Sequence, residues 1–452
     1  MYKVTNPATG EVIAEYPTAT DEQIIASINS ADRQFFAWKN SPLIDRVKML
    51  RRVSALFAER AEQLAELVTV EMGKRLVEAR GEISIVVDIF NYYADNAESL
   101  LADEQLAIRG GSAVIRKCPV GVLIGIMPWN YPYYQVARFV APNLALGNTI
   151  LLKHAPNCPS SALAIERLIH DAGVPSGAFV NIFASNEQIA WMIADHRVQG
   201  ISLTGSERAG SAVAAEAGRN LKKVVLELGG SDPMIILDSD DIANTVEVAV
   251  ESRMGNMGQA CNAPKRMIVM SDIYDEFVDL LTARMGKFKA GDPKDPDTTL
   301  APLSSVEAAQ KLQMQIQQAV DQGATLRTGG RIVAGTKAYL EATVLTDVKA
   351  GMKAHNEELF GPVAVVYRVE SENEAIALAN DTPFGLGSGV FSKDPERARR
   401  IGEQIDAGMV YLNAAGGSQA DLPFGGIKRS GLGRELGYLG IEEFMNKKVI
   451  RL

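Results

Sequence analysis

Short apolar runs that alternate with helix-length segments most constrain what this chain can fold into. Between residues 120 and 227 there are five such runs: Val120–Met127, Thr149–Lys153, Phe179–Phe183, Gly200–Thr204 and Lys223–Glu227. Strands separated by helical crossovers pair in parallel, because each crossover returns the chain to the same end of the sheet. The pattern therefore predicts an α/β fold with a parallel sheet built from βαβ units.

The same alternation starts again after Met234. Strands are expected near Arg266–Met270, Val363–Tyr367, Ser388–Phe391 and Gly408–Leu412, and helices at Asp272–Lys289 and Ser304–Gln322. Two α/β domains in tandem account for this, with a boundary near Gly229-Gly230, which is either a flexible joint or a turn that ends a strand. Helical spacing of apolar residues from Asp21 to about Leu106 predicts a helical cover.

The composition argues against several classes of protein. The 452 residues include 46 Lys and Arg and 55 Asp and Glu, a net charge of −9, which argues against a nucleic-acid or anionic-membrane partner. The most apolar run, Val120–Trp129, is about half as long as a membrane span, and turn residues soon after Met1 argue against a secretory signal. Cys118, Cys158 and Cys261 lack CxxC spacing, so neither a metal site nor a disulfide framework is indicated. We expect a cytoplasmic protein.

Cys261 and Glu227 are the main candidates for covalent chemistry. Cys261 follows Gly258-Gln259-Ala260 just after a helix-compatible stretch, and Glu227 ends the last predicted strand of the first domain. Small and polar neighbours favour an exposed, activated thiol over a buried structural cysteine. Both residues fall beside the domain junction, where ligand clefts preferentially form. Acyl chemistry through a thioester is therefore predicted.

Asn130 lies in the turn Pro128-Trp129-Asn130-Tyr131-Pro132, which two prolines and two aromatic residues make rigid. A fixed amide donor of this kind suits an oxyanion hole, where one preorganised hydrogen bond lowers the barrier by about 3 kcal/mol. The alternative is an asparagine that only satisfies the backbone of the turn.

A phosphate-binding turn is predicted although the GxGxxG motif is absent from the chain. Thr204-Gly205-Ser206 joins an apolar strand to the start of a helix, where backbone N–H groups can bind a pyrophosphate. Ordinary strand-to-helix turn chemistry, with Ser206 as the N-cap, is the alternative. Lys153 ends another strand, at the edge where open parallel sheets bind ligands; a solvated lysine is the alternative there.

In combination, these motifs make the chain resemble the NAD(P)-dependent aldehyde dehydrogenase superfamily over essentially its whole length. Seven motifs occur in the family's order: Pro128–Pro132, Leu152-Lys153, Thr204-Gly205-Ser206, Leu226–Gly230, Gly258–Cys261, Glu357–Pro362 and Pro423–Gly431. Each motif is modest by itself, and their common order makes the resemblance specific.

The resemblance implies an α/β, aldehyde dehydrogenase-like fold with a Rossmann-like cofactor domain, an α/β catalytic domain and a small β oligomerisation extension. The cofactor domain would comprise residues 1–100 and 120–228, the catalytic domain 229–440, and the extension 101–119 and 441–452. In the family, a terminal strand such as 446–452 pairs with the extension during oligomerisation. A homo-oligomer, dimer or tetramer, is therefore expected.

The resemblance also implies roles for individual residues. Cys261 would be the nucleophile, Asn130 and the Cys261 backbone N–H would hold the oxyanion, and Glu227 would activate the water that hydrolyses the thioester after hydride transfer to the nicotinamide. Without the resemblance, Glu358 would be interpreted as an acidic residue before the Phe360-Gly361-Pro362 turn. The residues implied to bind the cofactor are Met127, Pro128, Trp129, Lys153, Pro156, Gly205, Ser206, Glu227, Leu228, Glu358 and Phe360.

Pro156 affects the expected choice of cofactor. NAD-selective members commonly carry a glutamate three residues after the lysine that corresponds to Lys153, and this acid would repel the 2′-phosphate of NADP. The sequence Lys153-His154-Ala155-Pro156 lacks it. We therefore expect the protein to use NAD or NADP.

The substrate implied is succinate semialdehyde, because the motifs are most similar to those of the short bacterial succinate-semialdehyde dehydrogenase branch. Arg138 matches an arginine that binds the distal carboxylate, which a guanidinium can hold with two hydrogen bonds. Ser418 and Phe424 complete the predicted substrate site. Gly255 stands where some relatives carry a second arginine, so another small aliphatic aldehyde or semialdehyde is the alternative. Arg138 could instead pair with an internal acid.

Three other functions stay open from the sequence. An acylating dehydrogenase would pass the thioester to coenzyme A, a cysteine hydrolase would need a histidine partner for Cys261, and a non-catalytic protein would only bind nucleotide. Glu227 favours water as the acceptor, and none of the four histidines stands in a catalytic motif. Every expected catalytic residue is present, which disfavours the third alternative.

Overall fold

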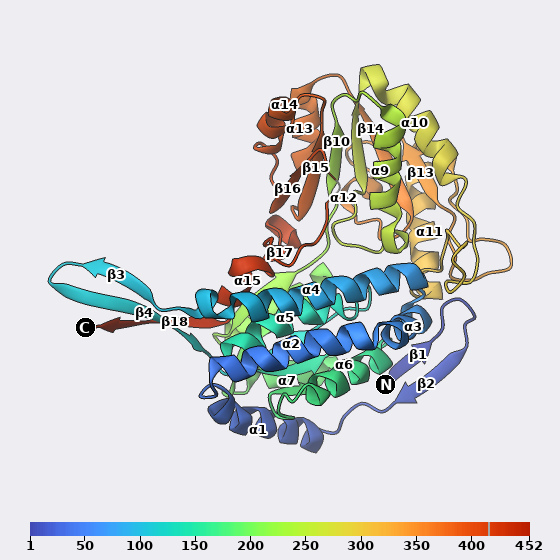
Figure 1. Cartoon of the computed structure of the whole chain (residues 1–452). Helices are drawn as coiled ribbons and strands as arrows, with labels where there is room; N and C mark the ends of the chain where they lie inside the picture. Colours follow the sequence, from blue (N-terminus) through green and yellow to red (C-terminus); the bar gives the residue numbers. More distant parts are fainter. Residues whose placement is uncertain (415) are drawn as a thin grey trace.

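The computed structural model describes residues 1–414 and 416–452, which form two α/β units and a projecting β arm (Figure 1). One unit contains a six-stranded sheet with the order β17-β9-β8-β5-β6-β7, and the other a seven-stranded sheet with the order β12-β13-β14-β11-β10-β15-β16. The two largest clusters of buried apolar side chains correspond mainly to these two units. The predicted α/β fold class is confirmed.

The five predicted strands of the first unit are confirmed as one parallel sheet. They are β5 (Val122–Ile126), β6 (Thr149–Lys153), β7 (Phe179–Asn181), β8 (Val198–Thr204) and β9 (Lys223–Glu227). The helices between them are α5 (Tyr134–Leu146), α6 (Pro159–Asp171), α7 (Asn186–Ala194) and α8 (Glu207–Arg219). Because the strands are parallel and in register, Lys153, Thr204 and Glu227 end at the same edge of the sheet, where such sheets bind ligands.

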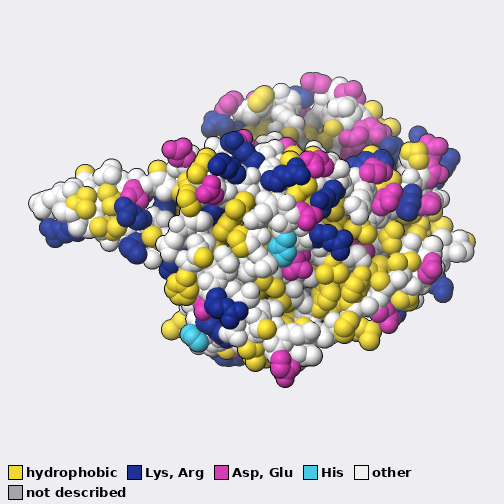
Figure 2. Space-filling view, turned by 60° about the horizontal axis from the view of Figure 1, so that its bottom comes forward, with side chains coloured by type: hydrophobic (Ala, Val, Ile, Leu, Met, Phe, Trp, Pro, Cys, Tyr) yellow, Lys and Arg dark blue, Asp and Glu magenta, His cyan; other side chains and the backbone are white. Residues whose placement is uncertain are grey.

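Four helices form the predicted helical cover: α1 (Asp21–Trp38), α2 (Leu43–Glu59), α3 (Ala61–Met72) and α4 (Leu76–Leu101). α1 packs on β6, and both α2 and α4 pack on α5. A hairpin of β1 (Tyr2–Thr5) and β2 (Val12–Tyr16) lies beside α3. Figure 2 shows Lys and Arg side chains interspersed with Asp and Glu over one face of the molecule. None of the described helices is long and apolar enough to span a membrane.

The second sheet is parallel except at one edge. Its strands are β10 (Pro233–Ile236), β11 (Arg266–Met270), β13 (Thr343–Thr346), β14 (Val363–Val369), β15 (Gly387–Phe391), β16 (Met409–Leu412) and the antiparallel edge strand β12 (Thr325–Thr328). Its helices are α9 (Ile242–Met254), α10 (Ser271–Met285), α11 (Val306–Asp321), α12 (Lys353–Asn356), α13 (Glu372–Asn380) and α14 (Pro395–Gly402). The strands and helices predicted after Met234 are confirmed within a few residues.

The chain returns to the first unit after the second sheet is complete. A 3-10 helix, η2 (Lys428–Ser430), precedes β17 (Gly431–Leu432), which pairs antiparallel with β9, and α15 (Gly437–Glu442) then packs against α5. The predicted terminal strand is β18 (Met445–Arg451). It pairs with β4 (Gly111–Pro119) of the same chain, which also pairs with β3 (Glu104–Ile108), and these strands form the projecting arm (Figure 1).

Candidate active site

The loop that leads to the candidate nucleophile has a backbone that few sequences can adopt. It contains the 3-10 helix η1 (Gly255–Gly258), in which Asn256 and Met257 have left-handed φ angles of 51° and 54°. A Cβ atom at Gly258 would lie 2.2 Å from the carbonyl oxygen of Gly361, so only glycine fits at that position. Backbone strain of this kind is often found at functional sites.

Cys261 follows this loop in a turn and is half-buried. The sequence predicted an exposed, activated thiol, and this prediction is corrected because Cys261 packs against the apolar cluster of the first unit. Burial raises the pKa of the thiol to about 12, although Arg138 and Lys265 oppose the rise. Lys265 Nζ also donates a hydrogen bond of 2.7 Å to the Cys261 carbonyl oxygen. The thiol is therefore protonated near neutral pH in the free protein.

Glu227 is the last residue of β9, and its side chain is buried without a partner. The residue is 2% exposed, and neither carboxylate oxygen has a hydrogen-bond partner among the described residues. Burial raises its pKa well above the usual value; Arg138 opposes this shift and Glu435 adds to it. The Glu227 carboxylate raises the pKa of the Cys261 thiol, so the two groups lie close enough to interact.

Asn130 connects the turn after β5 to the loop that precedes Cys261 through hydrogen bonds. Its Nδ2 donates to the Gln259 carbonyl oxygen at 3.1 Å, and Asn256 Nδ2 donates to the Asn130 carbonyl oxygen at 2.9 Å. An amide nitrogen has two N–H groups, so one donor of Asn130 is left for an oxyanion at Cys261. Its predicted role in an oxyanion hole stays a prediction.

A buried ion pair fixes the same turn from α4. Glu82 Oε1 accepts the backbone N–H groups of Tyr133 at 2.8 Å and Tyr134 at 3.1 Å, at the start of α5. Its other oxygen pairs with Lys74, and both side chains are fully buried. Lys74 Nζ lies 3.7 Å from the centroid of the Tyr131 ring. These contacts anchor the Asn130 turn to the helical cover.

A cavity of about 350 Å³ opens beside Cys261. Ser418 and Phe424, which were predicted to contact substrate, both line it, and Tyr134 and Gln135 line it from α5. None of the described lining residues is a lysine or an arginine. The structure therefore provides a chamber that would fit a small aldehyde, with uncharged polar groups from α5 and from the segment around Ser418, and with Glu78 and Glu82 from α4.

Arg138 is not among the residues that line this cavity, and its predicted role in binding the substrate carboxylate stays a prediction. Its side chain is fully buried, and Nε lies 2.7 Å from Oε2 of Glu435. The guanidinium lies behind the cavity wall, with Cζ 4.9 Å from the Tyr134 ring centroid and 4.5 Å from the Phe424 ring centroid. Although burial opposes the positive charge, the Glu435 carboxylate keeps the pKa of Arg138 above its usual value. Nη1 and Nη2 of Arg138 instead have hydroxyl partners at 3.4 Å, the Tyr134 hydroxyl and Thr204 Oγ1.

A second cavity, of about 340 Å³, lies at the carboxyl edge of the first sheet. Ile126, Leu203 and Val213 give it apolar walls, and Lys153 and Arg208 line it with positive charge. Burial lowers the pKa of Lys153, and no described carboxylate forms an ion pair with it. A buried cation beside apolar walls fits the adenosine half of a dinucleotide. We did not predict Arg208 from the sequence, although it lies two residues after the Thr204-Gly205-Ser206 turn.

The predicted pyrophosphate turn, Thr204-Gly205-Ser206, also has the geometry of an ordinary strand-to-helix turn. Ser206 is the N-cap of α8, and its Oγ accepts the backbone N–H of Ala209 at 3.3 Å. The Gly205 N–H donates to the Glu227 carbonyl oxygen at 2.9 Å. Pyrophosphate binding at this turn stays a prediction. Pro156 is exposed, three residues after Lys153.

The remaining predicted cofactor residues lie between this edge and the junction of the two units. Met127 is buried, and its N–H donates to the Lys153 carbonyl oxygen at 3.1 Å. Pro128 is half-buried. Leu228 packs so tightly against α8 that a Cβ at Gly210 would lie 2.6 Å from the Leu228 side chain. These residues form part of the carboxyl edge of the first sheet.

Glu358, Phe360 and Trp129 meet at the junction itself. The rings of Trp129 and Phe360 pack edge to face with centroids 5.8 Å apart, which joins the first unit to the second. Glu358 Oε1 accepts the Gly230 N–H at 3.1 Å and lies 3.3 Å from Lys265 Nζ. Lys265 also donates to the Cys261 carbonyl oxygen. A nicotinamide ribose bound by Glu358 would therefore lie beside the nucleophile.

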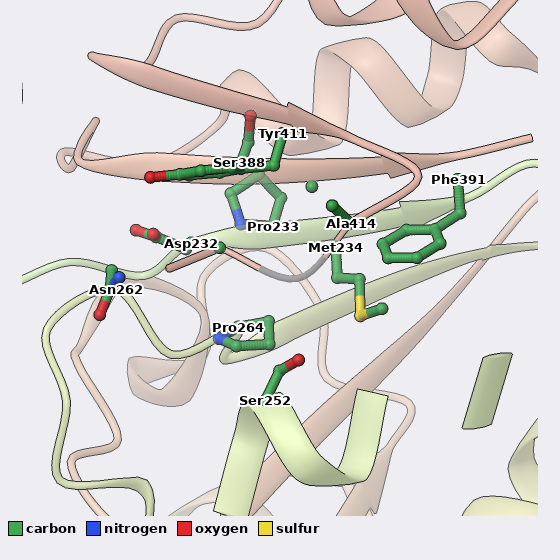
Figure 3. A pocket seen from close by; sticks show the side chains of 12 residues that line it. Asp232, Pro233, Met234, Ser252, Asn262, Pro264, Ser388, Phe391, Tyr411 and Ala414 are labelled. Carbon is green, nitrogen blue, oxygen red and sulfur yellow. The ribbon is translucent and has the colours of Figure 1, made fainter. Parts of the chain in front are cut away.

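A small third cavity, of about 20 Å³, lies on the other side of the nucleophile loop (Figure 3). Met234 and Phe391 lie at one end of it, and Asp232 and Asn262 at the other. Burial raises the pKa of Asp232 to about 6. The volume suits a single water and excludes a substrate. No cluster of three or more His, Cys, Asp or Glu side chains in the described part of the chain could hold a metal ion.

Comparisons with known proteins agree with this geometry. The model of the aldehyde dehydrogenase family matches residues 1–450. A protein of Deinococcus radiodurans named succinate-semialdehyde dehydrogenase, with NADP(+) in its name, is 52% identical over 450 residues, which are 100% of this chain and 94% of the relative. A protein of Mycobacterium bovis with the same activity in its name is 43% identical over 448 residues, 98% of each chain.

Solved structures are similar as well. The succinic semialdehyde dehydrogenase of Streptococcus pyogenes, whose crystal structure contains NADP+ as the cofactor, has a TM-score of 0.98 at 41% identity, and both chains are covered over 100% of their length. The match spans both sheets, the arm and the loops that carry Cys261 and Glu227. This chain therefore belongs to the aldehyde dehydrogenase family.

Proposed function

We propose that this protein oxidises succinate semialdehyde to succinate and that it uses NADP at least as well as NAD. The observation that carries the proposal is the cavity of about 350 Å³ that joins the thiol of Cys261 to the hydroxyl groups of Ser418 and Tyr134. The relatives named for this activity support it, since they match the whole chain at 52% and 43% identity.

The chain's own residues can carry out both halves of the reaction. Cys261 Sγ adds to the aldehyde carbon, while the free N–H of Asn130 donates to the developing oxyanion. The bound nicotinamide supplies the two-electron oxidation. Glu227 then takes a proton from the water that attacks the thioester, and its raised pKa makes it a stronger base once it is ionised.

The high pKa of the Cys261 thiol requires that its proton leave when substrate is present. Glu227 is a candidate acceptor, because both of its oxygens lack hydrogen bonds among the described residues and its charge acts on the pKa of the thiol. A carboxylate that accepts the thiol proton before it activates water would serve in both steps, as general bases do in other covalent mechanisms.

The preference for NADP rests on charge in the cofactor cavity. Lys153 and Arg208 line it, and the acid that would repel a 2′-phosphate is replaced by Pro156. Glu216 is the one acidic residue among the lining residues that the structure describes, and Arg219 pairs with it at 2.8 Å. The net charge of the cavity therefore favours a phosphate.

We also infer a cytoplasmic homo-oligomer. The unpaired outer edges of β3 and β18 in the arm, and exposed Val449 on β18, support association through this arm. The net charge of −9 argues against a nucleic-acid partner.

Initial rates for a panel of aldehydes with NAD and with NADP test the proposal. Succinate semialdehyde should have the highest kcat/KM, and both cofactors should support turnover. The Cys261→Ala variant provides the background rate, since it keeps the cofactor cavity and lacks the nucleophile. A kcat/KM for butanal equal to that for succinate semialdehyde would refute the substrate assignment and would favour a general small-aldehyde dehydrogenase.

A further inference from the structure

Lys265 places a buried ammonium group among the carbonyl oxygens of the loop that carries Cys261. The residue is 1% exposed. Its Nζ donates to the carbonyl oxygens of Ala260 at 3.0 Å, Cys261 at 2.7 Å and Ala263 at 3.3 Å. An ammonium group has three N–H donors, so these carbonyl groups can take up all of them. A buried charge is costly unless it is hydrogen-bonded in this way.

The backbone of Lys265 is fixed by the second sheet. Its N–H donates to the Asp232 carbonyl oxygen at 3.1 Å, and its carbonyl oxygen accepts from the Val365 N–H at 3.1 Å. At the far end of the side chain, Nζ lies 3.3 Å from Glu358 Oε1. The ammonium group is therefore held at both ends and can orient the loop beside it.

The hydrogen bond to Ala260 acts on the Cys261 N–H, because both groups belong to one peptide unit. This peptide is trans, since no cis peptide bond occurs in the described part of the chain. A trans peptide is planar, and its C=O and N–H point in opposite directions, so Lys265 fixes the direction of the N–H. The Cys261 N–H donates no hydrogen bond among the described residues, which leaves it for an oxyanion.

The positive charge of Lys265 also strengthens this donor. A cation at a carbonyl oxygen polarises the peptide, and its N–H becomes a better donor, as happens along chains of hydrogen bonds. The Ala263 N–H donates to the same Ala260 oxygen at 3.3 Å, and it carries no net charge. Without Lys265 the turn would keep the neutral contact and lose the charged one.

We propose that Lys265 is a positioning residue for the oxyanion hole: by donating to the Ala260 carbonyl oxygen, it orients and polarises the Cys261 N–H that binds the oxyanion. This inference rests on the proposed function only through the thioester chemistry at Cys261, and it holds for any aldehyde. Asn130, the other donor, is held separately through the Gln259 carbonyl oxygen.

Two reagents that attack the same thiol distinguish this role from simple support of the loop. In acylation by p-nitrophenyl acetate, Cys261 Sγ adds to the ester carbon through a tetrahedral oxyanion, and p-nitrophenolate leaves. Alkylation by iodoacetamide displaces iodide from a saturated carbon and forms no oxyanion. Both reactions need the thiolate, so changes in the pKa of the thiol largely cancel in the ratio of the two rate constants.

Both rates are measured on the protein without cofactor. Acylation is followed as the burst of p-nitrophenolate, with Cys261→Ala as the background. Alkylation is followed at Cys261 by peptide mass spectrometry, because Cys118 is partly exposed as well.

Lys265→Met keeps the length of the side chain and removes its donors. The ratio of acylation to alkylation should fall by roughly ten- to a hundredfold, because complete removal of an oxyanion donor costs about 10²–10³ and here the donor is only weakened. Lys265→Gln is the milder variant, since a neutral amide can still donate, with bonds roughly half as strong. Its ratio should fall by about three- to tenfold.

Arg266→Met is the matched control. Arg266 is also 1% exposed, and it donates to the carbonyl oxygens of Ser231, Leu378 and Ala379, none of which lies in the loop of Cys261. The variant therefore removes an equally buried cation from the neighbouring position, and the ratio should stay within about threefold of the wild-type value. Thermal unfolding measures the stability of each variant.

Each outcome supports or overturns the inference. An unchanged ratio in Lys265→Met or in Lys265→Gln overturns it, even where both rates fall together, because that result indicates support of the loop alone. Equal falls of the ratio in Lys265→Met and Arg266→Met overturn it as well. If Lys265→Met does not fold, Lys265→Gln decides. Neither reagent is an aldehyde, so a wild-type enzyme without preference for succinate semialdehyde refutes the proposed substrate and leaves this test intact.

Discussion

Arg138→Met should destabilise the whole protein and slow the oxidation of every aldehyde by a similar factor. In the folded chain the Arg138 side chain has no exposed surface, and its Nε lies 2.7 Å from Oε2 of Glu435, which is itself only 5% exposed. Methionine is a flexible apolar filler, so the variant removes the cation and retains much of the packing. Glu435 is then left with one hydrogen bond, from Ser202 Oγ at 3.1 Å.

The magnitude follows from the burial of both partners. Removing one member of a buried ion pair costs about 3–5 kcal/mol, because the remaining charge stays desolvated. Burial already raises the pKa of Glu435, and Arg138 is the main influence that lowers it. In the variant the carboxyl therefore binds a proton more tightly, which regains about 1.4 kcal/mol for each unit of pKa. We expect a net loss of about 2–4 kcal/mol near neutral pH, smaller at lower pH.

The substitution also acts on the catalytic base. Arg138 opposes the upward shift of the Glu227 pKa, so its removal raises that pKa further. Because deacylation needs the ionised carboxylate, the rising limb of the pH–rate profile should move to higher pH for all aldehydes alike.

Denaturant unfolding between about pH 6 and about pH 8 measures the loss of stability, and initial rates with succinate semialdehyde and butanal measure the two values of kcat/KM. The double variant Arg138→Met/Glu435→Gln is the control, since it leaves no unpaired charge and should recover most of the lost stability. A loss confined to the semialdehyde at unchanged stability would show that Arg138 contacts the substrate and that our account of its partner is wrong.

Three further predictions concern the thiol, the base and the cofactor. Because burial raises the pKa of Cys261 to about 12, its alkylation by iodoacetamide should keep accelerating above about pH 9, where an ordinary thiol is already ionised; a plateau near pH 8 would contradict this. Glu227→Gln should give a burst of NAD(P)H followed by turnover about a hundredfold slower. Its stability relative to wild type should increase with pH, because the folded state of wild type holds the Glu227 proton more tightly than the unfolded state and is penalised as the pH rises; a constant difference would count against a raised pKa. Arg208→Ala should raise the KM for NADP about tenfold with little change for NAD, and Pro156→Glu should shift preference toward NAD. Equal effects of Arg208→Ala on both cofactors would remove it from the 2′-phosphate site.

Local patterns predicted much of the fold because many of its strands are fully buried. β6, β9 and β11 have the same bounds in the structure as in the sequence prediction. β17 was missed because it has two residues, and its pairing with β9 depends on the tertiary fold rather than on any local pattern. β12 was missed for a similar reason, since its mostly exposed residues give little apolar signal.

The site was predictable where a residue's neighbours in the chain determine its role, and Cys261 and Glu227 are such residues. The ion pair of Arg138 with Glu435 could not be predicted from the sequence, because Glu435 lies in a segment that the chain reaches only after completing the second sheet. No spacing rule connects the two.

The pairing of β17 with β9 also sets the order in which the protein can be completed on the ribosome. Gly431 pairs with Glu227, and Ser430 Oγ donates to the Gly229 carbonyl oxygen, 201 residues away in the chain. At about 5–20 residues per second, a nascent chain exposes the edge of β9 for roughly 10–40 s before its neighbour emerges. During that interval the strand that carries the catalytic base is an open template for wrong pairing. Truncated chains that lack the last segment would hold the thiol and the base but leave this edge unprotected.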